Sequence, residues 1–155
     1  MIDKEFLKEK LNLITRDLER LKIFSDFTIN QMAEDFIKYA ALKNILMEII
    51  GRAIDINEHL VSEMAQPDME VPKTYRETFL LLGDLNILQR DFAGEISKSA
   101  GLRNAIVHEY NNLDENIIYK TVGEAINQYA KYCNYIFKFI ENSTLNKGDI
   151  EIQKP

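Results

Sequence analysis

The sequence predicts an all-α fold: an antiparallel up-and-down bundle of four main helices plus a short extra helix. Apolar residues recur at three- and four-residue steps through most of the 155 residues, as they do on the buried face of an α-helix. No segment shows the alternation of a half-buried strand. With 46% hydrophobic residues, a chain of this length can bury one core without disulfides. We therefore expect a single helical domain over residues 1–143 and a polar C-terminal tail over residues 144–155.

Two helices are expected in the N-terminal half. The apolar spacing predicts the first from about Asp3 to Lys22. A polar break follows at residues 25–26, and a second, longer amphipathic helix is expected from about Ile29 to Met64. Pro67 and Pro72 lie beyond its end, because proline cannot sit in a helix interior.

A start signal for a short helix follows the prolines. Thr74 as the N-cap and Glu77 three residues later fit a capping box, and this helix should end near Gly83. Another helix is expected from about Ile87 to Ser99, where the apolar spacing resumes.

The last third of the chain begins with a helical pattern from Arg103 to Tyr110. The preceding residues "SAG" can pause or bend the chain there. Asp114 is then expected to cap the last helix, which should run from about Glu115 to Glu141.

Charge and cysteine content narrow the possible functions. A formal net charge of −6 argues against a protein that coats nucleic acid through bulk electrostatics, but it leaves room for an enzyme with a few focused cations. The single cysteine, Cys133, cannot form an internal disulfide, and no Cys/His cluster offers a metal site. We therefore expect no metal and no cofactor. No window is apolar enough to span a membrane and the charged N-terminus has no signal core, so we expect a cytoplasmic protein.

The segment "AGLRNAIVHEYNNLD", residues 100–114, holds the densest cluster of chemically useful side chains. An arginine such as Arg103 can bind phosphate oxygens with two parallel hydrogen bonds. A histidine such as His108 can take a proton from a ribose 2′-hydroxyl or give one to the leaving oxygen. Asn104, Glu109 and Tyr110 complete the cluster. The chemistry suits RNA, because DNA lacks the 2′-hydroxyl.

The spacing of these residues raises a geometric difficulty. On an ideal helix, residues five apart are separated by about 140°, and residues seven apart lie nearly in line. Arg103 and Tyr110 would share a face while His108 points to one side. A bend near Gly101, the reach of arginine, or two copies of the chain that complete each other's sites are the open solutions. From the residues alone, a merely polar helix end also stays open.

The motif resembles that of a known family. "GLRNAIVHEY" resembles the Arg-x4-His signature of the HEPN superfamily, many of whose members are metal-independent ribonucleases, and Arg103-x4-His108-x-Tyr110 is similar to the signature of HepT-like toxins. Further similar stretches occur in the same order, so the resemblance covers roughly residues 5 to 140 of the chain. These stretches are "RAIDINEHLV", the proline break, "TYRETFLLLGDLNIL" and "LDENIIYKTV".

The resemblance implies a role for each matching residue. Arg103 and His108 match the catalytic pair, and Asn104 matches the polar residue after the arginine. Tyr110 matches the tyrosine that a minimal nucleotidyltransferase antitoxin of the MntA type modifies with AMP. The added charge and bulk beside Arg103 would keep an RNA phosphate out. The resemblance also implies a homodimer whose cleft joins two motif copies.

Two further groups of residues have both a structural and a functional interpretation. Asp55 and His59, four apart, share a helix face and can form an oriented pair, and HepT-like sequences tend to carry such residues here. The structural alternative is a surface ion pair or a hydrogen bond inside the bundle. Nearby Arg52 can add positive potential or be a solvated charge. The aromatic side chains of residues 129–139 suggest base stacking, but their spacing favours core packing or a dimer seam.

The sequence thus predicts the toxin ribonuclease of a toxin–antitoxin pair, with RNA as its substrate and a nucleotidyltransferase as its partner. The alternative is a non-catalytic helical dimer that binds the nucleotidyltransferase and only presents Tyr110. A helical bundle with a polar helix end ranks third.

Overall fold

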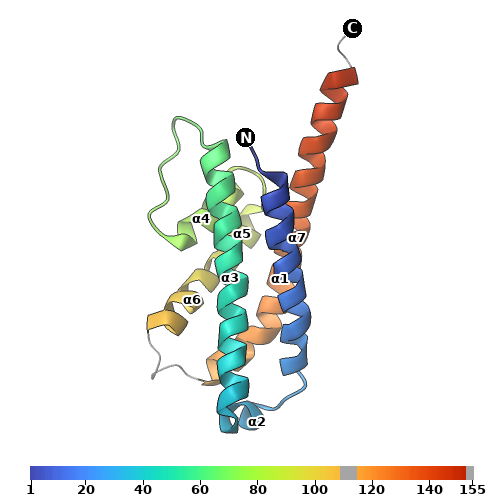
Figure 1. Cartoon of the computed structure of the whole chain (residues 1–155). Helices are drawn as coiled ribbons and strands as arrows, with labels where there is room; N and C mark the ends of the chain where they lie inside the picture. Colours follow the sequence, from blue (N-terminus) through green and yellow to red (C-terminus); the bar gives the residue numbers. More distant parts are fainter. Residues whose placement is uncertain (109–114, 153–155) are drawn as a thin grey trace.

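The computed structural model describes residues 1–108 and 115–152, and in them it contains seven helices and no strand (Figure 1). The all-α fold class is therefore confirmed. The helices, in chain order, are α1 (Lys4–Phe24), α2 (Ile29–Glu34), α3 (Phe36–Met64), α4 (Tyr75–Asp84), α5 (Arg90–Ser97), α6 (Ser99–His108) and α7 (Glu115–Ile152). None of the described helices is long and apolar enough to cross a membrane.

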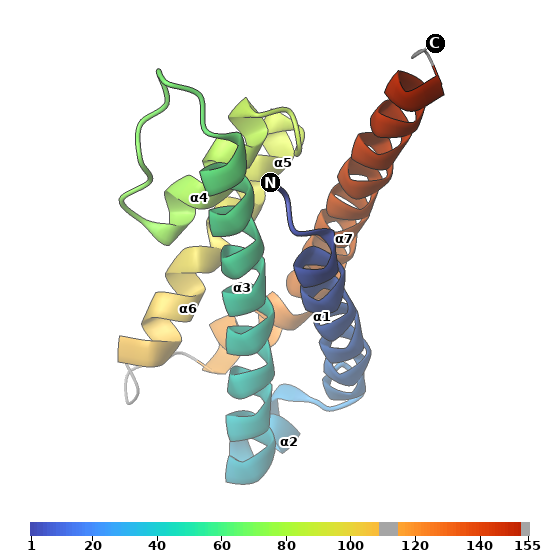
Figure 2. The ribbon, with the colours of Figure 1, turned by 45° about the horizontal axis from the view of Figure 1, so that its top comes forward.

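Helix α3 is the central element of the bundle. It packs against α1 on one side and against α4 and α6 on the other, while α7 packs mainly on α1. Figures 1 and 2 both show α1 on one side of α3 and α4 and α6 on the other. This arrangement places α6, which carries most of the motif, directly on α3.

A single hydrophobic core joins all seven helices. Its largest fully buried side chains include Tyr129 and Tyr132 of α7 and Phe79 of α4, whose ring meets Tyr132 edge-on at a centroid distance of 6.1 Å. The first two aromatic residues of the α7 series therefore serve core packing. Cys133 is buried beside them.

The long second helix expected from the sequence is divided in two. Asp35 leaves the helical conformation with φ −107° and ψ 98°, and its carboxylate accepts the backbone N–H groups of Ile37 and Lys38 at 3.0 and 3.1 Å. An aspartate in this position satisfies two donors that a helix start leaves free. Because the break takes only one residue, the apolar spacing hardly changes across it, and the pattern did not reveal it.

The helices around the motif also begin and end differently from the prediction. Helix α5 starts at Arg90 rather than Ile87, because Ile87 and Leu88 close the end of α4 by donating their N–H groups to the carbonyl of Leu82. The break before the motif lies at Lys98, whereas Gly101 is inside α6.

The two predicted ends of the last helix have different outcomes. Helix α7 begins at Glu115 as expected but continues past Glu141 to Ile152. Figure 1 shows this extension rising beyond the other helices. Asp114, the expected cap, lies outside the described residues.

Candidate functional site

Helix α6 fixes where the motif side chains lie. Ala100 and Ile106 are buried in the core and attach the helix to the bundle. Arg103 is half-buried between them, while Asn104 and His108 are exposed on the outer side. Glu109 and Tyr110 lie outside the described residues.

Arg103 is held by an aromatic ring. Its guanidinium carbon lies 5.2 Å from the centroid of the Tyr75 ring, at the start of α4, which is the geometry of a cation–π contact. Its Nε is buried and has no hydrogen-bond partner among the described residues. A Cβ added to Gly51 of α3 would lie 3.8 Å from this Nε, so the arginine passes close over a position without a side chain.

The guanidinium borders a hollow of about 270 Å³. Its wall combines carboxylates of α3 with two arginines, and most of these charges neutralise one another. Arg52 binds Asp17 and Glu48, and Lys10 binds Asp55 at 3.0 Å. No such ion pair forms at Arg103 within the described parts of the chain. The residues that line the hollow are Glu48, Gly51, Arg52, Ile54, Asp55, Glu58, Tyr75 and Arg103.

A chain of hydrogen bonds ties Tyr75 to the core. The hydroxyl of Thr78 donates to the Tyr75 carbonyl at 2.6 Å and accepts from the amide of Asn57 at 3.2 Å. The hydroxyl of Tyr132 in turn donates to the Asn57 side-chain oxygen at 2.6 Å. Burial raises the pKa of Tyr132 well above its ordinary value, so it stays a donor near neutral pH.

The N-terminus of α4 is also capped as the sequence predicted. The Thr74 hydroxyl accepts the N–H of Glu77 at 3.2 Å, but the Glu77 carboxylate reaches the N–H of Lys73 rather than that of Thr74. The backbone beside Tyr75 is therefore fixed from both sides.

The structure keeps Arg103 and His108 apart within one copy of the chain. Because α6 is continuous from Ser99 to His108, the two side chains leave the helix about 140° apart. A bend near Gly101, one of the three open solutions, is absent from α6. Of the solutions to the geometric difficulty, the reach of the arginine side chain and a second copy remain.

Asp55 and His59 do not form the pair that the sequence suggested. Asp55 lines the hollow and is bound by Lys10. His59 Nε2 accepts the N–H of Asp3 at 2.9 Å, and its ring packs on Phe6 with a centroid distance of 5.3 Å. His59 thus anchors the start of α1, as in the structural interpretation.

Large apolar side chains are exposed at the end of the bundle where α6 finishes. Phe36 and Ile37 at the start of α3 are 80% and 72% exposed, and Ile117 at the start of α7 is 59% exposed. Val107 in the last turn of α6 is also exposed. These helix ends lie at the same end of the molecule (Figures 1 and 2). We call these four residues the apolar end patch. Such a concentration is typical of an interface.

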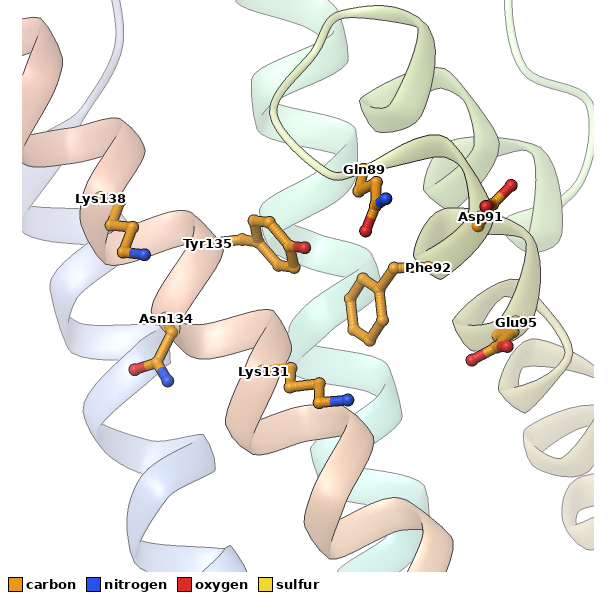
Figure 3. A pocket seen from close by; sticks show the side chains of 8 residues that line it. All are labelled: Gln89, Asp91, Phe92, Glu95, Lys131, Asn134, Tyr135 and Lys138. Carbon is orange, nitrogen blue, oxygen red and sulfur yellow. The ribbon is translucent and has the colours of Figure 1, made fainter.

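A second hollow, of about 440 Å³, lies between α5 and α7 and includes none of the predicted site residues. Figure 3 shows the rings of Phe92 and Tyr135 next to each other in its wall, with centroids 5.2 Å apart. Its rim is mixed in charge, with Asp91 and Glu95 on α5 and lysines on α7. This mixture favours no particular ligand.

Sequence reasoning missed Tyr75 and Gly51. Tyr75 directly follows the predicted N-cap, so its helix could be foreseen, but its contact with Arg103 could not. Tyr75 is in α4 and Arg103 is in α6, two helices that α5 separates in the chain. No local sequence pattern predicts the packing of one against the other.

Comparison with known proteins gives concordant matches. The family model described as Ribonuclease HepT-like matches residues 14–136. The tRNA nuclease HepT of Aphanizomenon flos-aquae is 32% identical over 141 residues, which cover 90% of this chain and 92% of that protein. The mRNA nuclease HepT of Shewanella oneidensis is 24% identical over 133 residues, which cover 85% and 96%.

A solved structure agrees with the fold. It is that of a tri-AMPylated Shewanella oneidensis HEPN toxin in complex with an MNT antitoxin. The TM-score is 0.77 at 22% identity, and the match covers 88% of this chain and 99% of that one.

Proposed function

Because this chain belongs to the Ribonuclease HepT-like family, we propose that it is the toxin of a toxin–antitoxin pair and cleaves RNA in the cytoplasm without a metal. The observation that carries the proposal is the guanidinium of Arg103, which borders an open hollow and forms no ion pair with a described carboxylate. The N–H groups at the end of the guanidinium, beyond the buried Nε, are available for a phosphate.

The proposed reaction is an internal transesterification. The ribose 2′-oxygen attacks the neighbouring phosphorus, the bond to the 5′-oxygen breaks, and a 2′,3′-cyclic phosphate and a free 5′-hydroxyl result. Arg103 binds the non-bridging oxygens and stabilises the charge that builds on them. His108 either accepts the 2′-hydroxyl proton or protonates the leaving oxygen. Asn104, exposed beside them, is proposed to contact the RNA backbone.

We propose that two copies of the chain form each site. The continuous α6 directs Arg103 and His108 to different sides. Val107 of the apolar end patch directly precedes His108 and lines one hollow together with Phe36 of the same patch. A homodimer that covers this patch would bring His108 of one copy toward Arg103 of the other.

Mixed dimers test this arrangement sharply. We would refold an equal mixture of the Arg103→Ala and His108→Ala chains. If each site takes its arginine and histidine from different copies, every mixed dimer has one intact site and cleavage returns. If both residues act within one copy, the mixture stays as inactive as its parents.

The activity itself is tested with purified protein and RNA in the presence of EDTA. Wild-type protein should cleave, and Arg103→Ala and His108→Ala should each lose at least about a hundredfold in rate. Arg103→Lys should recover only part of it, because an ammonium lacks the two-pronged geometry. Cleavage that persists in His108→Ala would show that this histidine is not catalytic.

Regulation is proposed to act on Tyr110. A partner nucleotidyltransferase would transfer AMP from ATP: the tyrosine oxygen bonds to the α-phosphorus, the bond to the β-phosphate breaks, and pyrophosphate leaves. The added phosphate would repel RNA. The solved Shewanella oneidensis HEPN toxin, which is AMPylated and in complex with an MNT antitoxin, supports this proposal. Intact mass after co-expression with a neighbouring nucleotidyltransferase gene should rise by adenylate increments in wild type but not in Tyr110→Phe.

The second candidate is a binding module without catalysis. The net charge of −6 and the carboxylates that line the Arg103 hollow favour it, because both disfavour RNA. If folded, unmodified wild-type dimer cleaves no RNA while Tyr110 is still adenylylated, this candidate replaces the ribonuclease.

A further inference from the structure

Arg103 is an arginine whose described partner is a ring, although carboxylates surround it. Glu48, Asp55 and Glu58 line the same hollow, and the first two pair with other cations. A carboxylate partner would occupy the fork of N–H groups that a phosphate needs. The face of an aromatic ring attracts the guanidinium and leaves those groups free.

The backbone that carries the ring is held in place from two directions. The Thr74 cap fixes the first turn of α4, and the bond from Thr78 ties the Tyr75 carbonyl to the buried Asn57. Tyr75 is nevertheless 40% exposed, so it does not serve the core. Its ring lines the hollow and contacts the Arg103 guanidinium there, on a backbone whose position is fixed.

We propose that Tyr75 is the positioning residue for Arg103. Its ring holds the guanidinium over the rim of the hollow and keeps it from pairing with the carboxylates of α3. This inference rests on the proposed ribonuclease function for its effect on rate, but the contact itself can be tested without RNA.

Three variants distinguish the effect of the aromatic ring from the effects of side-chain size and of the hydroxyl. Tyr75→Phe keeps the ring and should cleave RNA within about threefold of wild type, since a ring of either kind attracts a cation. Tyr75→Leu keeps apolar bulk and Tyr75→Ala removes it. Both should lose about tenfold to a hundredfold in kcat, because a small misplacement of a catalytic group costs that much. Leu80→Ala, an exposed change on the same helix, is the control for the stability of α4.

A double-mutant cycle shows whether Tyr75 acts through Arg103. RNA binding is measured in the uncleaving His108→Ala background. Tyr75→Leu and Arg103→Ala should each reduce the steepness of binding against salt by about 0.7 per lost contact to single-stranded RNA. The two changes together should do no more than either alone. Additive losses would overturn the proposal, because Tyr75 would then contact RNA independently.

Nuclear magnetic resonance tests the contact directly. The Nε–H of Arg103 is shielded from solvent and lies near the Tyr75 ring, so ring current should displace its signal from those of the other arginines. The displacement should persist in Tyr75→Phe and vanish in Tyr75→Leu.

The outcomes separate the two proposals. An unchanged Arg103 signal in Tyr75→Leu overturns the positioning role whatever the activity. If the Arg103 signal is displaced but the protein never cleaves RNA, the Tyr75–Arg103 contact is supported and the ribonuclease function is contradicted. Unchanged kcat in Tyr75→Leu, with Arg103→Ala inactive, overturns the positioning role and leaves the ribonuclease in place.

Discussion

Replacing Tyr132 by phenylalanine removes the hydroxyl at the buried end of the hydrogen-bond chain that leads from Tyr75 through Thr78 and Asn57. The Tyr132 side chain is fully buried, and its hydroxyl donates to Asn57 Oδ1 at 2.6 Å. Asn57 is also fully buried, so water cannot replace the lost donor. An unsatisfied acceptor in the core costs roughly 1–3 kcal/mol. We expect the free energy of unfolding to fall by this amount.

Tyr129 provides the matched control, on the same helix and equally buried. Its hydroxyl shares a hydrogen bond of 2.6 Å with Ser99 Oγ, but Ser99 also donates to the Ile96 carbonyl at 2.6 Å. Ser99 therefore keeps a partner in Tyr129→Phe. We expect this variant to lose only the net value of one hydrogen bond, about 0.5–1.5 kcal/mol.

Urea unfolding followed by far-ultraviolet circular dichroism measures both variants. In a domain of this size, each 1 kcal/mol also lowers Tm by roughly 2–4 °C. The reasoning fails if Tyr132→Phe stays within about 0.5 kcal/mol of wild type, the range of an ordinary surface change. It also fails if Tyr129→Phe is the more damaging of the two.

Three further predictions concern small residues. Gly83→Ala should destabilise the fold by about 1–3 kcal/mol, because its Cβ would lie 3.0 Å from that of Ala93 on the facing helix; thermal unfolding checks this. Gly101→Ala meets nothing within 4 Å and should instead stabilise α6 by up to about 1 kcal/mol, with RNA cleavage retained. Burial raises the pKa of Cys133 from 9.0 to about 11, so the thiol should react with Ellman's reagent only after unfolding. Between about pH 9 and pH 11 the unfolded chain loses this proton and the folded one keeps it, so the free energy of unfolding should fall as pH rises, less steeply in Cys133→Ala.

Local signals in the sequence predict much of the fold. Thr74 caps α4 as its side-chain chemistry predicts, and the apolar periodicity located the long helices. It could not reveal the break at Asp35, because a one-residue break leaves the spacing of apolar residues almost unchanged. Nor could it foresee that Ile87 and Leu88 close α4 rather than open α5.

The same distinction between local and tertiary features decides what could be predicted about the candidate site. The side chains with useful chemistry, Arg103 and His108, stand out from the sequence, and their roles stay predictions. Their surroundings depend on contacts between helices distant in the chain. The spacing of Asp55 and His59 allows them to form a pair, but Lys10 of α1 binds the first and the N–H of Asp3, the N-cap of α1, binds the second. Tertiary partners of this kind leave no local pattern.

The buried carboxylate of Asp17 has a consequence for the alignment of α1 on α3. Its apolar neighbours along α1 repeat with the helical period, so a slide of one turn, about 5.4 Å, would still match apolar residues with apolar residues. That slide would carry Asp17, which is 1% exposed, away from Arg52, its partner on α3. Asp17 would then keep only the longer contacts to Arg16 and Arg20 of its own helix, at 3.6 and 3.4 Å, so the slide would be destabilising. We infer that this one ion pair makes the two helices choose a single alignment among otherwise similar ones. The same stretch of α3 forms the wall of the Arg103 hollow, so the position of that wall relative to α1 depends on this alignment.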